Sequence, residues 1–132
     1  MLNIKKLLTK ILNELHSLDS RPYIIDQGES ATHCFYRKWS DGTLEQWGNY
    51  SVPATAGNGS VTVPLAINYI DINYTVTLSR SSNAAEDVTI LGEFDYTNKN
   101  RYREVNRFKV SALKTGFAYA IYFGFYTIGK WK

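Results

Sequence analysis

The residues that could carry nucleophilic chemistry are few and poorly placed for it. The chain has two histidines, His16 and His33, and one cysteine, Cys34. A nucleophile and its base must share a face, whereas neighbouring residues of a strand point to opposite faces. His33 and Cys34 therefore do not form a dyad, and we expect Cys34 to be a small buried residue. His16 falls on the solvated side of a predicted helix, so we expect no catalytic role there.

Metal and carboxylate chemistry have equally little support. A metal site needs several His, Cys or carboxylate ligands at short spacing, so we expect no metal and no cofactor. A glycosidase needs two carboxyl groups close together. The candidates fall in polar loops and at strand ends, and nothing in the sequence pairs them: Asp71, Glu86, Asp87, Glu93, Asp95 and Glu104. We interpret the chain as non-enzymatic. A small hydrolase is the alternative, which a close carboxylate pair with one raised pKa would support.

Aromatic and amide side chains favour binding instead. Sugars are held by aromatic faces that stack on C–H groups and by polar groups that fix hydroxyls. In "FYRKWSDGTLEQWG", Trp39 and Trp47 lie on the two arms of one hairpin, and we expect them to pack into the core. Trp131 and Tyr50 are further candidates by type. Because exposed loops carry recognition, the predicted ligand-binding residues are Asn83, Tyr96, Asn98, Asn100 and Tyr102.

Charge and hydropathy argue against two classes of partner. The net charge is only +3, and Glu104 interrupts the cluster of Arg101, Arg103, Arg107 and Lys109. Nucleic-acid binding needs a concentrated basic face, which this pattern does not supply. No apolar run is long enough for a membrane span, and the N-terminal segment lacks the features of a signal peptide. We therefore expect no nucleic acid, no membrane insertion, and assembly in a cytoplasm.

The N-terminal segment follows a heptad pattern. Its apolar residues alternate at spacings of three and four: Met1, Ile4, Leu8, Ile11, Leu15 and Leu18. Leu at a with Ile at d favours trimers or tetramers. The predicted oligomerisation residues are Ile4, Leu8, Ile11, Leu15 and Leu18. An isolated helix of this length is marginal and needs a partner surface. The alternative is an amphipathic helix that folds back on its own β-domain.

From Thr32 onward the apolar residues alternate with polar ones, which is typical of half-buried strands. Ser40-Asp41-Gly42 predicts a hairpin turn, and Pro64 predicts an edge strand. The segment "FAYAIYFGFYTIG" is apolar on both faces, so it predicts central strands buried on both sides, with a break at Gly124. We predict a mainly β chain: a helix over 1–20, a linker over 21–31, and an antiparallel β-sandwich of about six to eight strands over 32–132.

Residues 36–48, "YRKWSDGTLEQWG", resemble the opening hairpin of the C-terminal receptor-binding domains of tailed-bacteriophage tail fibres. The resemblance continues in order through "VTVPLAINYIDINYTVTLS" and "KTGFAYAIYFGFYTIGKW", and covers about residues 33–132. Phe125 or Tyr126 stands where that family commonly has Trp, and Lys130 stands where it has Tyr. The domain is also similar to H-type lectins, which are trimeric sugar-binding sandwiches.

The resemblance implies a homotrimeric virion component of a phage tail or fibre, whose tip recognises a bacterial surface polysaccharide. The family usually has a long shaft before this domain, whereas this chain begins with Met and one short helix. We therefore expect a minor fibre protein that docks on a larger baseplate, tail or capsid protein through residues 1–20. The alternative is a structural trimerisation cap or decoration fibre that binds no sugar. The family has no fixed ligand motif, so no loop residue inherits a binding role.

Overall fold

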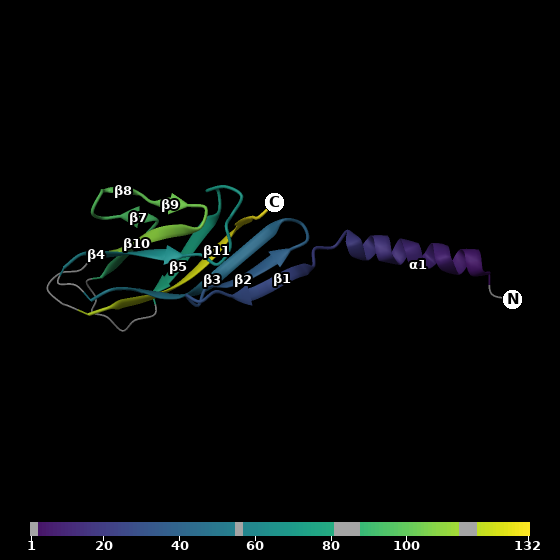
Figure 1. Cartoon of the computed structure of the whole chain (residues 1–132), viewed down its shortest axis with the longest axis horizontal. Helices are drawn as coiled ribbons and strands as arrows, with labels where there is room; N and C mark the ends of the chain where they lie inside the picture. The colour runs from purple at the N-terminus through teal and green to yellow at the C-terminus, as the bar shows by residue number, and fades with distance from the viewer. Residues whose placement is uncertain (1–2, 55–56, 81–87, 114–118) are drawn as a thin grey trace.

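The computed structural model describes residues 3–54, 57–80, 88–113 and 119–132. One helix, α1 (Ile4–Asp19), extends from the end of an elongated β-domain (Figure 1). The strands of the domain are β1 (Ile24–Glu29), β2 (Phe35–Trp39), β3 (Thr43–Val52), β4 (Gly59–Pro64), β5 (Thr75–Arg80), β6 (Thr89–Gly92), β7 (Phe94–Asp95), β8 (Asn100–Arg101), β9 (Arg103–Glu104), β10 (Arg107–Leu113) and β11 (Ile121–Lys130).

Two antiparallel sheets form a sandwich. The five-stranded sheet has the order β1-β2-β3-β11-β5, and the four-stranded sheet joins β4, β10, β6 and β9. Apolar side chains of both sheets make one core, in which the rings of Phe108 and Phe125 meet edge to face. Pro64 ends β4, which lies at a sheet edge as predicted. The mainly β sandwich after one helix is confirmed. Eight strands of four or more residues lie in the described ranges, within the predicted number.

The predicted hairpin between β2 and β3 is present. Gly42 has a φ of 93°, a left-handed conformation that glycine adopts without a side-chain clash. Its N–H donates to the carbonyl oxygen of Trp39 at 3.1 Å. Asp41 closes the turn by accepting a hydrogen bond from the Thr43 N–H at 2.8 Å. The turn fixes which residues of β2 and β3 share a face.

Residues 24–29, which the sequence assigned to a linker, form β1. This strand pairs antiparallel with β2 and makes one edge of the five-stranded sheet. Ile24 and Ile25 suit a strand because they are β-branched, but the following Asp26, Gln27 and Gly28 break the alternating pattern. All six residues of β1 are exposed. The strand has no buried face, so its sequence lacks the alternation of apolar and polar residues that would indicate a strand.

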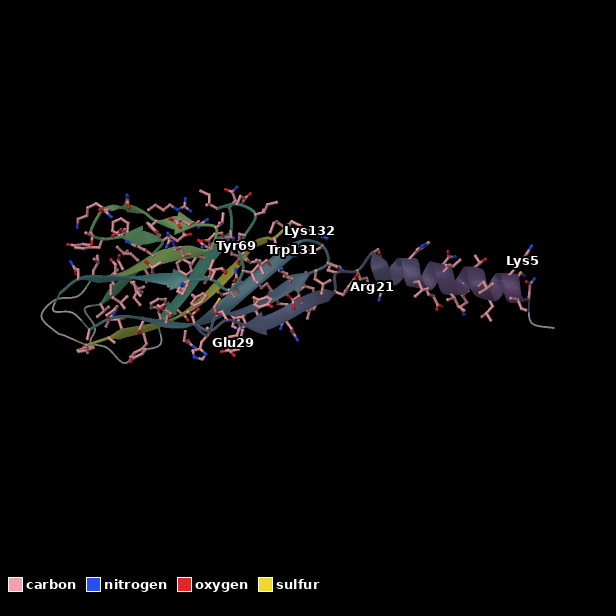
Figure 2. The ribbon with its side chains drawn as sticks, viewed as in Figure 1. Lys5, Arg21, Glu29, Tyr69, Trp131 and Lys132 are labelled. Atoms are coloured by element: carbon pink, nitrogen blue, oxygen red, sulfur yellow. The ribbon has the colours of Figure 1, made fainter. Side chains whose placement is uncertain are left out.

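Helix α1 does not fold back on the β-domain. Figures 1 and 2 show it pointing away, with Lys5 towards its far end and Arg21 at the junction. The apolar side chains in its described part are 42% to 67% exposed: Ile4, Leu7, Leu8, Ile11, Leu12 and Leu15. The folded-back alternative is therefore wrong for this structure. Within the described ranges, no helix is long and apolar enough to cross a membrane.

Strand β11 corrects one prediction. It lies between β3 and β5, as expected for a central strand, and it runs through Gly124 without a break. Phe123 and Phe125 face the core, but Tyr122 is 56% exposed and Ile128 is 38% exposed. The strand is thus buried on one face only, and its second apolar face is uncovered by the rest of the described chain.

Candidate functional site

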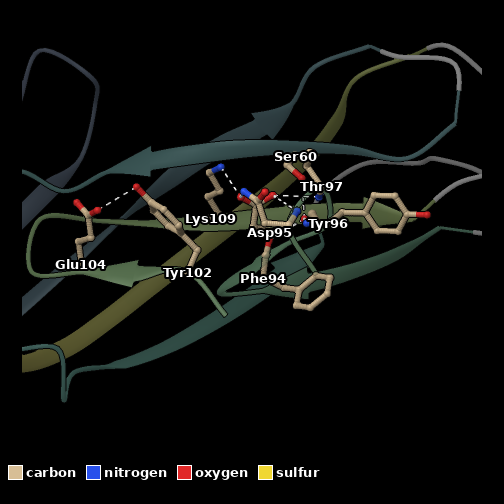
Figure 3. A network of polar contacts seen from close by, with 10 residues as sticks. Ser60, Phe94, Asp95, Tyr96, Thr97, Tyr102, Glu104 and Lys109 are labelled. Atoms are coloured by element: carbon tan, nitrogen blue, oxygen red, sulfur yellow. Dashed lines mark hydrogen bonds and ion pairs between the residues drawn. The ribbon is translucent and has the colours of Figure 1, made fainter. Parts of the chain in front are cut away.

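The segment from β7 to β9 carries four of the five predicted ligand-binding residues and is organised around Asp95 (Figure 3). Asp95 is 1% exposed, and its Oδ2 lies 2.7 Å from the Lys109 ammonium. The Thr97 N–H donates to Oδ1 at 3.0 Å, and the Asn98 amide donates to Oδ2 at 2.8 Å. The pKa of Asp95 is lowered to about 2, chiefly by the hydrogen bond from Lys109 and further by the hydrogen bonds from Asn98.

Tyr96 and Tyr102 are half-buried, and each ring has a lysine over it. The Lys99 ammonium lies 3.2 Å from the Tyr96 ring centroid, and the Lys109 ammonium lies 4.8 Å from that of Tyr102. The Tyr102 hydroxyl also donates to Glu104 Oε1 at 3.1 Å. Cation–π contacts of this kind orient both partners. The two rings are therefore held by their own segment, and only part of each is open to a ligand.

The asparagines of this segment differ in availability. Asn98 is exposed, but its amide group is held by Asp95. Asn100 is exposed in β8, opposite Asp95 in the ladder. Asn83 lies outside the described residues. The segment occupies the half of the domain away from α1 (Figure 1). A ligand-binding role for these residues stays a prediction.

Among the described residues, three candidate carboxylates of the hydrolase alternative are paired with basic side chains: Glu93, Asp95 and Glu104. Glu86 and Asp87 lie outside the described residues. Glu104 accepts a 2.6 Å hydrogen bond from Arg107 Nε, and Glu93 pairs with Arg103. The pKa values of Asp41, Asp95 and Glu104 all lie below the usual range, because each carboxylate accepts hydrogen bonds. A general acid needs the opposite shift.

His33 and Cys34 do not come together either. His33 has a φ of 58° in the turn before β2, and its Nδ1 lies 2.6 Å from Glu29 Oε1 at the surface. Cys34 is buried as predicted, and burial raises the pKa of its thiol. In the part of the chain that the structure describes, no three His, Cys, Asp or Glu residues gather as a metal site would require.

A second surface lies on the outer side of the five-stranded sheet. Cross-strand neighbours bring bulky side chains together there, because Trp47 is opposite both Phe35 and Tyr126. The Phe35 and Trp47 rings stack with centroids 6.1 Å apart. We call this surface the aromatic face and define it by Phe35, Arg37, Trp39, Glu45, Trp47, Tyr122, Tyr126 and Ile128.

The prediction that Trp39 and Trp47 pack into the core is wrong. Gln46 takes the core position in β3 and is fully buried. Its amide donates to the Ile67 carbonyl oxygen and accepts from the Ile67 N–H, both at 2.9 Å. Because successive strand residues alternate, Glu45 and Trp47 must then point outward.

Glu45 joins the polar atoms of the aromatic face. It accepts hydrogen bonds from Trp39 Nε1 at 2.6 Å and from the Tyr126 hydroxyl at 2.7 Å. Burial and this carboxylate raise the pKa of Tyr126 to about 12. The Arg37 guanidinium lies 5.9 Å and 5.3 Å from the ring centroids of Trp39 and Trp47. The polar tips of Trp39 and Tyr126 are thus paired within the face.

Comparisons with solved structures identify this architecture. An N-truncated R1-type pyocin tail fibre aligns with 89% of this chain and 94% of its own, with a TM-score of 0.56 and 15% identity. The chain has the fold of an R-type pyocin tail fibre. A Pseudomonas aeruginosa R1 pyocin fibre comprising its C-terminal residues 323–701 aligns with 80% of this chain and has a TM-score of 0.52 and 16% identity. This chain spans 28% of that longer tail-fibre structure.

The fold expected from the resemblance to phage tail-fibre domains is therefore confirmed. No family model matches the sequence, and no curated protein matches it. Within this tail-fibre fold, sequence reasoning missed the aromatic face, although the signal was present. The segment around Tyr122 and Tyr126 is apolar on both faces, and one chain covers only one of them.

Proposed function

We propose that this chain is a non-enzymatic component of a tail fibre, which assembles as a homotrimer and recognises a bacterial surface polysaccharide. The carrying observation is the match of 89% of the chain to an R1-type pyocin tail fibre. The polysaccharide and the trimer come from the resemblance of the hairpin and closing motifs to phage receptor-binding domains. On this proposal the protein is made in the host cytoplasm and resides in the virion or a similar particle.

Helix α1 supports the trimer. Its heptad positions carry Leu8 and Leu15 at a, with Ile4 and Ile11 at d, and all four side chains are exposed in the single chain. A helix of sixteen residues with an uncovered apolar side is stable only against a partner. Leu at a with Ile at d favours more than two strands. A parallel three-helix bundle satisfies both requirements.

The layout of the chain supports an attachment end and a recognition end. Helix α1 leaves the domain from the half that contains Trp131 and Lys132, and the segment with Tyr96 lies in the opposite half (Figures 1 and 2). A larger virion protein that holds α1 would therefore leave the far loops free to meet a cell surface. We place the polysaccharide contacts in those loops, at Tyr96, Asn98, Asn100 and Tyr102.

A structural cap or decoration fibre that binds no sugar is the second candidate. Its support is the internal pairing of the loop: Asn98 is held by Asp95, and Tyr102 by Glu104 and Lys109. A cap has no need of free polar groups, whereas a sugar site does. Within this segment, Asn100 and the exposed parts of the Tyr96 and Tyr102 rings remain available for a ligand.

Binding of the purified full chain to bacterial cells and to their isolated surface polysaccharides tests the proposal. Tyr96→Ala should abolish binding, while the melting temperature stays close to that of the unchanged protein. Tyr23→Ala is the matched control, because Tyr23 is 53% exposed and lies at the α1 end of the domain. A trimer that binds no cell and no polysaccharide would favour the cap.

A further inference from the structure

The two sheets differ in how the chain covers their outer sides. Outside the four-stranded sheet, the segment from β7 to β9 packs on β10 and leaves Ser111 fully buried. Ser111 Oγ donates to the Phe94 carbonyl oxygen at 2.7 Å and accepts from the Tyr96 N–H at 3.1 Å. No described segment covers the aromatic face of the five-stranded sheet in this way. The segment from β7 to β9 therefore covers the outer side of the four-stranded sheet, whereas the outer side of the five-stranded sheet is uncovered in the described chain.

The open side exposes large apolar side chains that lie together. Phe35 is 39% exposed, Tyr122 is 56%, Tyr126 is 37% and Ile128 is 38%. They come from two strands that flank β3, and Trp47 of β3 lies between Phe35 and Tyr126. A contiguous apolar patch of this kind marks an interaction site more often than a scattered set does.

The charges of the aromatic face suit contact between identical copies. Arg37 and Glu45 lie 3.9 Å apart and carry opposite charges, so the centre of the face has no net charge. Glu45 also satisfies the Trp39 indole and the Tyr126 hydroxyl. Burying this face would therefore leave these two polar groups paired, and two such faces would not repel each other. A polyanionic or polycationic partner would find no complementary charge there.

Exposed apolar side chains also occur in β1, the strand next to α1 in the sequence. Ile24 and Ile25 of β1 are 41% and 45% exposed, and β1 follows α1 directly. Bundled helices would hold three β-domains around one axis. Contacts around a threefold axis are heterologous, so a projecting part of one copy meets a recess of the next. The aromatic face has both: Tyr122 projects, and a hollow of about 400 Å³ lies between Trp47, Tyr126 and Ser79.

We propose that the aromatic face is a subunit interface, occupied by a second copy of this chain. The inference rests on the homotrimer of the proposed function and adds the surface that the β-domains share. It explains why β11 is apolar on both faces: one faces its own core and the other faces a neighbour. It also leaves the segment around Tyr96 outside the interface, where a receptor can reach it.

Thiol reactivity in the intact full chain tests this interface. Thr77 is exposed in the single chain, lines the hollow and lies opposite Tyr126. Thr89, which is exposed in the other sheet, is the matched control. The only native cysteine, Cys34, is buried and gives the background rate. In the trimer, the Thr77→Cys thiol should react at least about ten-fold more slowly than the Thr89→Cys thiol, and equally fast in denaturant.

The possible outcomes separate the two proposals. A monomeric chain would contradict the trimer of the proposed function. A trimer in which both thiols react equally fast would contradict the interface alone. Protection of Thr77→Cys only after polysaccharide is added would make the aromatic face a ligand site and overturn the interface.

A second pair of variants gives an independent readout. Tyr122→Lys should raise the concentration at which the trimer dissociates by about ten-fold or more, because it puts a charge into an apolar contact. Ile70→Lys changes a side chain with similar exposure, 60% against 56%, outside the aromatic face and should leave assembly unchanged. Equal behaviour of the two variants would contradict the interface.

Discussion

The Tyr126 hydroxyl on the last strand donates a 2.7 Å hydrogen bond to Glu45, which is 81 residues earlier in the chain. The bond joins β11 to β3 across the outside of the sheet, where the sequence predicted no organised polar group. The Glu45 side chain is only 19% exposed because Trp39 and Arg37 surround it. Glu45 thus ties Trp39 and Tyr126 to one carboxylate within a single chain.

Replacing Glu45 should therefore weaken the domain. Glu45→Ala removes the acceptor of Trp39 Nε1 and Tyr126 and leaves Arg37 without its carboxylate. We expect a loss of about 1–3 kcal/mol in the free energy of unfolding, measured with urea. Glu29→Ala is the control, because the Glu29 carboxylate pairs with the exposed His33 at the surface, and it should cost under about 0.5 kcal/mol. Equal losses would mean that Glu45 has no special role.

Gln46 should be intolerant of an apolar substitute, although it is a polar residue in the core. Gln46→Met keeps the size but leaves the partly buried Ile67 N–H and carbonyl without their Gln46 partners. We expect a loss of about 2–4 kcal/mol, since each orphaned group costs about 1–3 kcal/mol. Gln27→Met, at an exposed position in β1, should be nearly neutral. A stable Gln46→Met variant would contradict this reading of β3.

Stability should fall at alkaline pH. Burial raises the pKa of Tyr69 to about 12, and the pKa of Tyr126 is also raised to about 12. A raised folded-state pKa gives stability that is complete below the ordinary tyrosine value near 10 and is lost as pH rises to about 12. Urea unfolding between pH 9 and about 12 measures this loss. Tyr69→Phe should flatten the decline, and an unchanged slope would show that Tyr69 titrates normally.

The ion pair between Asp95 and Lys109 should make the segment from β7 to β9 sensitive to acid. The pKa of Asp95 is lowered to about 2, mainly by Lys109. A lowered folded-state pKa gives stability that is present above the ordinary value near 4 and is lost as pH falls towards 2. Lys109→Met should unpair the buried carboxylate, destabilise the protein at neutral pH and move this loss to higher pH. Hydrogen exchange at Thr97 and Asn98 would report it, and unchanged exchange would contradict the pairing.

Local patterns in the sequence were enough to predict the sandwich. The Ser40-Asp41-Gly42 turn and the alternation in β4, β5 and β10 depend on neighbours in sequence, so they can be read directly. β1 was missed because none of its residues is buried, and alternation signals a strand only when one face is. The heptad predicted α1, and its exposed side chains are consistent with a partner outside the chain.

The orientation of the hairpin could not be predicted in the same way. Size and hydrophobicity place Trp47 in the core and Gln46 outside, and the structure has the reverse. Two hydrogen bonds to Ile67, 21 residues away, make a buried Gln46 acceptable, and no local pattern contains that information. Tyr96, Asn98, Asn100 and Tyr102 lie at least partly exposed in the segment from β7 to β9. The contacts of Asp95 and Tyr102 with Lys109 could not be predicted, because Lys109 comes from a different strand.

The solution mass of the full chain, measured by light scattering after size exclusion, tests the homotrimer most directly. One chain has a mass of 15.1 kDa. We predict a single species at three times that value, about 45 kDa. A single species at 15.1 kDa would contradict the trimer. The exposed sides of α1 and of the five-stranded sheet would then need a different partner.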